Sequence, residues 1–139
     1  MAIGARVVAP GFYLNGIEAT ADGAWLVIVQ TVTGKLFRVD PQTGVTKLID
    51  LGGAAVPIGD GLLLAGSRLY VVQNSRNIAV INLNNDLTSG VIERTINDPD
   101  FRVPSTMASF GDSLYVVNAR FDTTPGPNVD YDIVEAPKN

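Results

Sequence analysis

Residues 14–44 read LNGIEATADGAWLVIVQTVTGKLFRVDPQTG, and this stretch decides the fold. Its short apolar segments are separated by the dipeptides Asp22-Gly23 and Thr33-Gly34, which are typical of tight β-turns. Residues 25–30 are almost continuously apolar, as in a strand that is buried on both faces. Because a more polar segment follows at residues 45–51, the stretch predicts four antiparallel strands with the last one outermost.

The same pattern returns twice downstream. The equivalent positions Leu26, Tyr70 and Tyr115 are 44 and 45 residues apart. A period of roughly 40–50 residues with four strands per unit is the signature of β-propeller blades. The sequence therefore predicts an all-β fold: one half-propeller domain over residues 1–139 with three four-stranded blades, at residues 14–51, 59–96 and 103–136.

The third unit lacks a fourth strand of its own, whereas a spare strand is expected over residues 3–9. In propellers, such a strand commonly closes the ring by completing the last blade. Three blades cannot close a ring, because propellers usually need about four or more. We therefore expect a homodimer with six blades, joined through its blade edges, in which residues 3–9 complete the partner's third blade. The alternative is a natural or engineered fragment of a longer propeller.

Composition excludes several kinds of function. The chain has no Cys and no His, so zinc–thiolate sites, cysteine nucleophiles and Ser-His-Asp triads are impossible within it. The net charge of −4 argues against a nucleic-acid partner, since phosphate binding needs a basic surface. No signal peptide is visible, and no apolar run reaches the roughly 20 residues that span a membrane. We expect a soluble protein, not a membrane protein, of undetermined compartment.

Polar side chains cluster where a propeller has the mouth of its central channel. Inner strands start at this face, and second strands end there. The strand starts carry Asn15, Asp60, Ser105 and Thr106, and Glu18 lies within the first inner strand. The second-strand ends carry Gln30, Gln73, Asn74, Asn118 and Arg120.

Asn15 and Asp60 are the candidate metal ligands among these residues. Their oxygens suit a hard divalent cation such as calcium, which takes about six to eight oxygen ligands. The alternative is that Asn-Gly and Asp-Gly are ordinary turn dipeptides. Arg120 has two interpretations as well: it could bind a substrate carboxylate or form a surface salt bridge.

Four segments resemble a known family. They are LNGIEATADG (14–23), GKLFRVDPQTG (34–44), GDGLLLAGSRLYVVQN (59–74) and LYVVNARF (114–121). Together they are similar to the C-terminal half of the six-bladed propellers of the gluconolactonase, senescence-marker and luciferin-regenerating-enzyme family. The resemblance implies a divalent cation, often calcium, in the central channel and hydrolysis of sugar lactones.

The resemblance also implies roles for individual residues. Asn15 resembles the family's metal-binding Asn, and Asp60 resembles the Asp that is both metal ligand and proposed catalytic base. The family's Glu ligand and a further substrate-contacting Asn lie in blades that this chain lacks. A symmetric dimer would place a second Asn15 and Asp60 there instead.

Two functions therefore remain open. One is a metal-dependent lactone hydrolase that takes a small lactone or sugar-acid ligand. The other is a non-catalytic structural or binding module.

Overall fold

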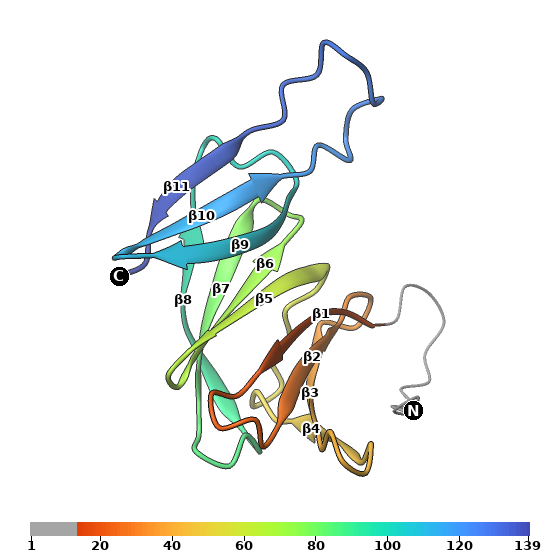
Figure 1. Ribbon diagram of the computed structural model, residues 1–139, viewed down its shortest axis with the longest axis vertical. Helices are drawn as coiled ribbons and strands as arrows, with labels where there is room; N and C mark the ends of the chain where they lie inside the picture. Colours follow the sequence, from red (N-terminus) through yellow and green to blue (C-terminus); the bar gives the residue numbers. More distant parts are fainter. Residues whose placement is uncertain (1–13) are drawn as a thin grey trace.

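The computed structural model describes residues 14–139, which form eleven strands in three antiparallel sheets (Figure 1). The expected strand over residues 3–9 lies outside the described part of the chain. Blade one is the sheet β1-β2-β3-β4, in sequence order. Its strands are β1 (Leu14–Ala19), β2 (Leu26–Gln30), β3 (Lys35–Val39) and β4 (Thr46–Ile49).

Blades two and three repeat this order. Blade two contains β5 (Gly59–Ala65), β6 (Arg68–Gln73), β7 (Asn77–Leu83) and β8 (Gly90–Asn97). Blade three contains β9 (Pro104–Phe110), β10 (Ser113–Asn118) and β11 (Ile133–Pro137). The all-β fold in three blades is confirmed. Within residues 14–139 the third sheet has three strands, and β11 is its outer edge.

The last strand begins later than the sequence suggests. By sequence, residues 129–135 are the strand candidate that follows a Pro- and Gly-rich loop, but β11 starts at Ile133. The backbone N–H of Asn118 donates to the carbonyl of Asp132 at 3.0 Å, which closes the loop between β10 and β11 at its base. The long loop therefore projects beyond the sheet (Figure 1).

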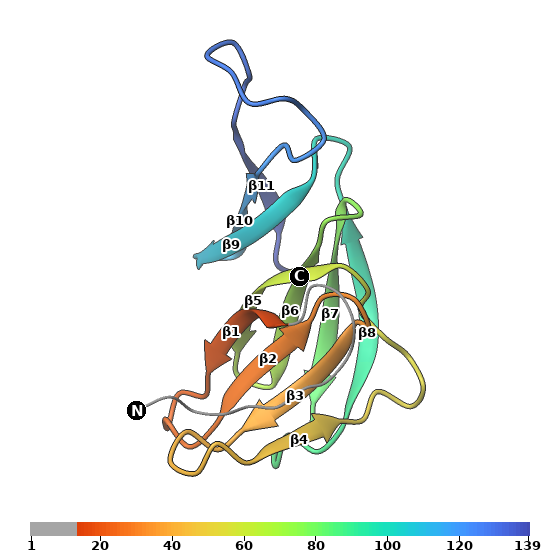
Figure 2. The ribbon, with the colours of Figure 1, turned by 90° about the vertical axis from the view of Figure 1, so that its right-hand side faces the viewer.

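The three innermost strands lie next to one another. β5 contacts both β1 and β9, and Figure 2 shows β9, β5 and β1 in succession along one side of the molecule, with β8 and β4 on the other. Each inner strand joins the second strand through a hairpin whose glycine has a positive φ: Gly23, Gly66 or Gly111. The inner strands therefore run in the same direction along what would be the wall of a central channel.

Two hydrophobic cores hold the blades together. The core between blades one and two contains Val27, Val29, Leu69 and Val71. The core between blades two and three contains Tyr70 and Val72 with Leu114 and Val116. Alternate residues of β6 thus enter different cores, which explains why a strand in blade two reads as a continuous apolar run. Each fully buried Leu or Val contributes about 1.5–3 kcal/mol relative to exposure.

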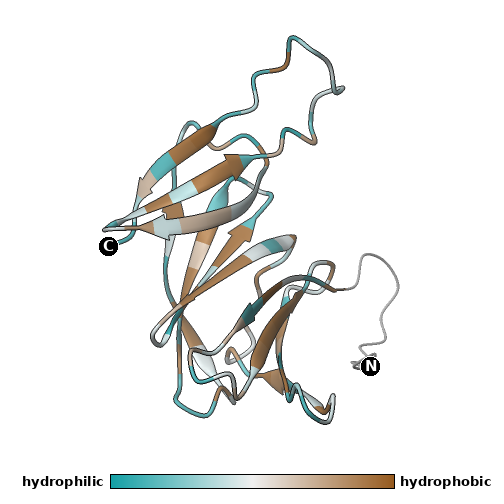
Figure 3. Ribbon diagram, viewed as in Figure 1, coloured by the Kyte–Doolittle hydropathy of each residue, from teal (hydrophilic) through white to brown (hydrophobic). Residues whose placement is uncertain are grey.

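The two ends of the arc leave apolar residues exposed. Blade three exposes Phe110, Val117 and Ile133, and blade one exposes Ile17 and Leu48. In Figure 3 apolar colour covers much of β10 and β11, although blade three has only blade two as a neighbour. No helix in residues 14–139 has the length and hydropathy to cross a bilayer.

Candidate functional site at the channel mouth

The start of each inner strand has the same irregularity. In blade one the register slips between Leu14 and Ile17, and in blade two it slips between Gly59 and Leu62. In blade three the partner of Asn118 is Pro104, whereas the partner of Val117 is Thr106. The irregularities recur every 45 residues, and they contain Asn15, Asp60 and Ser105 respectively. A β-bulge re-aims a side chain, so these three polar residues occupy equivalent places on adjacent inner strands.

A glycine follows Asn15 and Asp60 and allows the inner strands to approach closely, whereas Thr106 follows Ser105. A Cβ atom on Gly16 would lie 2.0 Å from the carbonyl oxygen of Asp60, and one on Gly61 would lie 2.7 Å from that of Ser105. Neither glycine has a positive φ, and both lie inside strands. The interpretation of these dipeptides as turns is therefore wrong. Their glycines are needed because backbone meets backbone between adjacent inner strands.

Asp60 is held in place by Asn74. The Asn74 side-chain amide donates to Asp60 Oδ2 at 3.1 Å and to the carbonyl oxygen of Pro104 at 2.8 Å. The structure thus brings together two of the residues that the sequence assigned to the channel mouth. Asn74 also ties blade two to the start of β9 in blade three. Both N–H groups of the amide are thereby used, and Asp60 Oδ1 is the carboxylate oxygen left for another ligand.

Gln73 and Asn118 are buried and hold loops. Gln73 donates to the carbonyl of Pro57 at 2.7 Å, in the loop that leads from β4 to β5. Asn118 is fully buried: it donates to the carbonyl of Asp100 at 2.8 Å and accepts from the backbone N–H of Arg102 at 2.7 Å. Each amide therefore fixes the loop that precedes the inner strand of its own blade. The equivalent amide of Gln30 is also buried, and its Nε2 has no partner within residues 14–139.

These loops carry repeated backbone strain. Ile58 and Val103, which lie 45 residues apart, have φ values of 51° and 53°. Left-handed backbone is unfavourable for β-branched residues and costs about 1–3 kcal/mol at each position. Each strained residue directly precedes the bulge that presents Asp60 or Ser105. The buried amides compensate for this strain, because they fix the residues that precede each strained position.

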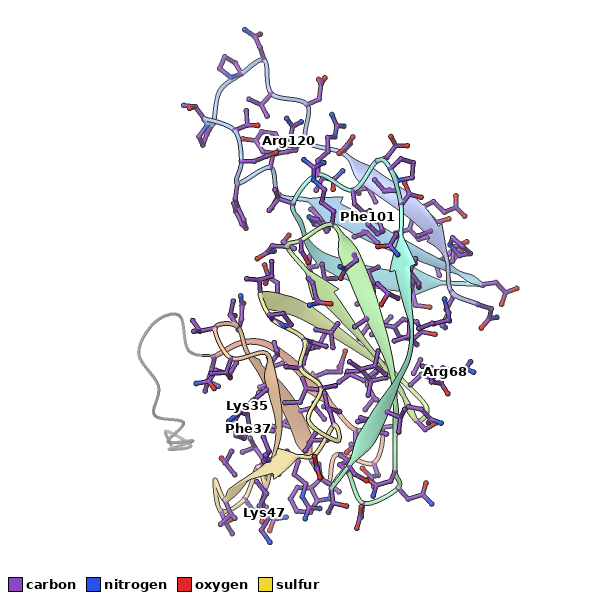
Figure 4. All side chains as sticks on the ribbon, turned by 180° about the vertical axis from the view of Figure 1, so that it is seen from behind. Lys35, Phe37, Lys47, Arg68, Phe101 and Arg120 are labelled. Atoms are coloured by element: carbon purple, nitrogen blue, oxygen red, sulfur yellow. The ribbon has the colours of Figure 1, made fainter. Side chains whose placement is uncertain are left out.

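The remaining candidates are arranged differently. Asn15 and Thr106 are exposed, and Ser105 is half-buried. Glu18 is half-buried and accepts from the adjacent backbone N–H of Ala19 at 3.1 Å. Arg120 pairs with Asp122 at 3.4 Å and donates to Thr123 Oγ1 at 3.0 Å. Figure 4 shows Arg120 at the projecting loop, away from the inner strands of blade one, so the salt-bridge interpretation holds.

A second polar cluster was not anticipated from the sequence. The carboxylate of Asp132 pairs with Arg102 and accepts from Asn118 Nδ2 at 2.7 Å. The bond from Asn118, with the nearby guanidinium of Arg102, lowers the pKa of Asp132 below its ordinary value of 3.8. The two charged residues are 30 positions apart, so no local pattern could have paired them. This cluster anchors the loop before β9 to the loop before β11.

The mouth residues of one chain provide oxygen ligands but few charges. Asn15, Asp60 and Ser105 supply one amide, one carboxylate and one hydroxyl. Residues 14–139 contain no group of three or more acidic side chains that could hold a metal ion. Calcium takes about six to eight oxygens, so the donors of a single chain are too few to fit it.

Comparisons with known proteins identify the fold. No protein-family model matches the chain, and no curated protein sequence matches it. Among solved structures it is similar to a putative 6-phosphogluconolactonase from Bacteroides uniformis, with a TM-score of 0.59 and 14% identity over 91% of this chain and 43% of that one.

Two further structures are also similar. BamB from Moraxella catarrhalis has a TM-score of 0.52 and 18% identity, over 76% of this chain and 31% of that one. The β-propeller domain of Cps50 (Swd1) from Myceliophteria thermophila has a TM-score of 0.50 and 18% identity, over 89% of this chain and 43% of that one. This chain therefore spans less than half the length of these structures, and its three sheets are β-propeller blades.

Proposed function

We propose that the chain is half of a six-bladed ring that a second copy closes, and that the channel mouth of the ring binds a divalent cation together with a small lactone or sugar-acid ligand. The observation that supports this most directly is the bulge repeated at 45-residue intervals. It presents Asn15, Asp60 and Ser105 from three adjacent inner strands.

The open faces of the arc support closure by a second copy. The face of blade three away from blade two carries Tyr115 and Val117, whose cross-strand partners are Glu135 and Ile133. Contiguous exposed apolar residues at the open face and edge of a sheet favour association. In a two-fold ring, this face meets blade one of the other copy, and residues 3–9 of that copy pair with the free edge of β11.

Blade one offers a matching face. A cross-strand row runs through Ile17, Ile28, Phe37 and Leu48, on the side opposite the core. The two ends of this row are exposed, Phe37 is half-buried, and Ile28 is buried. Figure 4 shows Lys35 and Phe37 together on the side of blade one that faces away from blade two. Lys35 is opposite in charge to Glu135 on blade three. Apolar rows with complementary charges suit a specific interface.

Closure of the ring changes the number of metal ligands. Two copies place Asn15, Asp60 and Ser105 around one channel twice, which doubles the oxygen set and brings in a second carboxylate. Six protein oxygens, supplemented by water, reach the number that calcium takes. The cation therefore depends on assembly, and a single chain is expected to bind it weakly.

Lactone hydrolysis is the second candidate, and the orientation of Asp60 favours it. Asn74 holds Oδ2, so Oδ1 can accept a proton from a water molecule that attacks the lactone carbonyl. A bound cation would polarise that carbonyl. The ester C–O bond then breaks, and the leaving alkoxide takes up a proton to give the hydroxy acid.

Thermal unfolding with and without calcium tests the cation site. We expect millimolar calcium to raise the Tm of the wild type, since binding to the folded state stabilises it by mass action. Asp60→Asn should abolish the shift. Asp112→Asn, in the exposed turn between β9 and β10, should keep it. The absence of a shift in the wild type would contradict the cation site.

Hydrolysis of δ-gluconolactone, followed with and without a chelator, separates the two functions. A chelator-sensitive rate that Asp60→Asn removes would support the hydrolase. A calcium-dependent Tm without any hydrolysis would support the non-catalytic binding module.

A further inference from the structure

A groove between blades one and two lies at the opposite end of the strands from the channel mouth. Its walls are the turn between β1 and β2, the turn between β5 and β6, and the loop between β7 and β8. In β1 and β2 the pair Ala19↔Leu26 marks this end, whereas Leu14↔Gln30 marks the mouth. The groove has a volume of about 570 Å³, within the range of about 300–1,000 Å³ typical of small-molecule sites.

The only tryptophan of the chain lines this groove. Trp25 is half-buried; its backbone N–H donates to the Thr20 hydroxyl at 3.0 Å, and its C=O accepts from the backbone N–H of Thr20 at 2.9 Å. The guanidinium of Arg38 stacks 4.5 Å from the indole centroid. A cation on one ring face fixes the plane of the indole. Trp25 is thus a rigid aromatic surface in the wall of the groove, with little conformational entropy to lose on binding.

Contacts among the loops hold the other walls. Arg38 donates to the carbonyl of Asp86, in the loop between β7 and β8. The backbone N–H of Leu83 donates to the carbonyl of Ser67 at 2.8 Å, which ties the turn between β5 and β6 to the end of β7. Arg38 therefore links the tryptophan to the opposite loop. The groove is preformed, which lowers the cost of binding a ligand.

Polar groups surround the tryptophan. Asp22 Oδ1 accepts from Thr20 Oγ1 at 2.6 Å and from the backbone N–H of Ala24 at 3.0 Å, so Oδ2 is the oxygen left for a ligand. The same hydrogen bonds lower the pKa of Asp22, which is ionised at neutral pH. Ser67 and Asn85 add a hydroxyl and an amide from the other two walls.

We infer that this groove is a binding site for a neutral pyranose, with the sugar's C–H face on Trp25 and its hydroxyls bonded to Asp22 and Asn85. A pyranose has one apolar face and a rim of hydroxyl groups, and an aromatic wall with a few fixed polar groups matches both. The free Oδ2 of the Asp22 carboxylate accepts a sugar hydroxyl, and its charge repels a sugar acid. The site is thereby distinct from the channel mouth, and it does not depend on Asp60 or on a cation.

Saturation-transfer NMR on the intact chain tests this inference, with the methyl α- and β-glycosides of glucose, galactose and mannose as probes. We expect transfer to at least one of them, with a change in the emission of Trp25 in the same titration, whereas glucuronate should leave that emission nearly unchanged. Trp25→Ala should abolish the transfer. Phe121→Ala, which removes an exposed aromatic side chain from the loop after β10, should leave it unchanged.

Asn85→Ala is the milder variant, because it alters one exposed side chain in a loop. It should weaken the affinity about tenfold, the equivalent of one lost hydrogen bond. Absence of transfer from every methyl glycoside, or equal transfer in the wild type and Trp25→Ala, overturns the inference. Asp60→Asn should leave transfer from the methyl glycosides unchanged. The experiment therefore tests sugar binding in the groove independently of cation binding at the channel mouth.

Discussion

The sequence Leu-Tyr-Val-Val occurs in both β6 and β10, yet the two copies have different environments. In blade two all four residues, 69–72, are buried. In blade three Leu114 and Val116 are buried, whereas Tyr115 is half-buried and Val117 is 36% exposed. The cause is the number of neighbours: blade two has a blade on each side, and blade three has one. The exposed residues of β10 therefore mark the face where another blade fits.

The largest expected effect comes from the tyrosines at the same position in these strands. Tyr70→Ala removes a buried ring from the core between blades two and three, and it should lower the free energy of unfolding by about 3–5 kcal/mol. Tyr115→Ala should keep the β-sheet circular dichroism spectrum but weaken association. Urea unfolding and light scattering on both variants give the test. Equal losses of unfolding free energy with unchanged association would contradict the difference between the blades.

The junction of the inner strands should be the next most sensitive. In Gly61→Ala the new methyl group would meet the backbone of Ser105 and Thr106, so we expect a loss of about 1–3 kcal/mol in the free energy of unfolding. Gly126→Ala is the matched control, since nothing lies within 4 Å of its Cβ position. It should change the unfolding free energy by less than about 0.5 kcal/mol. Similar values for both variants in urea would argue against the close approach.

Removal of the buried amide should lower the free energy of unfolding more in blade three than in blade two. Asn118→Ala leaves the N–H of Arg102 and the carbonyl of Asp100 without their partner, and it should lower the free energy of unfolding by about 2 kcal/mol. Gln73→Ala removes one hydrogen bond, to Pro57, and should cost about 1 kcal/mol. Urea unfolding measures both losses from the shift of the midpoint, provided that the m-value of each variant equals that of the wild type. If Gln73→Ala were the more damaging, the loop-holding role of Asn118 would be overstated.

The smallest effect is a pH dependence in blade three. The pKa of Asp132 is lowered in the folded chain, so its contribution to stability is complete above the unfolded value near 3.8 and is lost as the pH falls through the folded value. The stability difference between the wild type and Asp132→Asn should therefore shrink as the pH drops below about 4. Asp130→Asn, in the same loop, should keep the wild-type profile. A difference independent of pH would rule out this linkage.

The repeat and most strands could be predicted from the sequence, because apolar runs and turn glycines are local signals. The role of Gly16 and Gly61 could not, since it depends on a strand about 45 residues away in the chain. The amides of Gln73 and Asn118 were expected at the channel mouth from their place at strand ends. They are buried because the loop before each inner strand folds over them, which no local pattern reveals.

The native mass of the wild-type chain in solution tests the central proposal most directly. Light scattering at low micromolar concentration should give twice the 14.7 kDa of one chain, because each open apolar face is covered by the other copy. Val117→Asp, which places a charge on that face, should return the mass to that of one chain. A single-chain mass for the wild type at every concentration would contradict closure of the ring by a second copy.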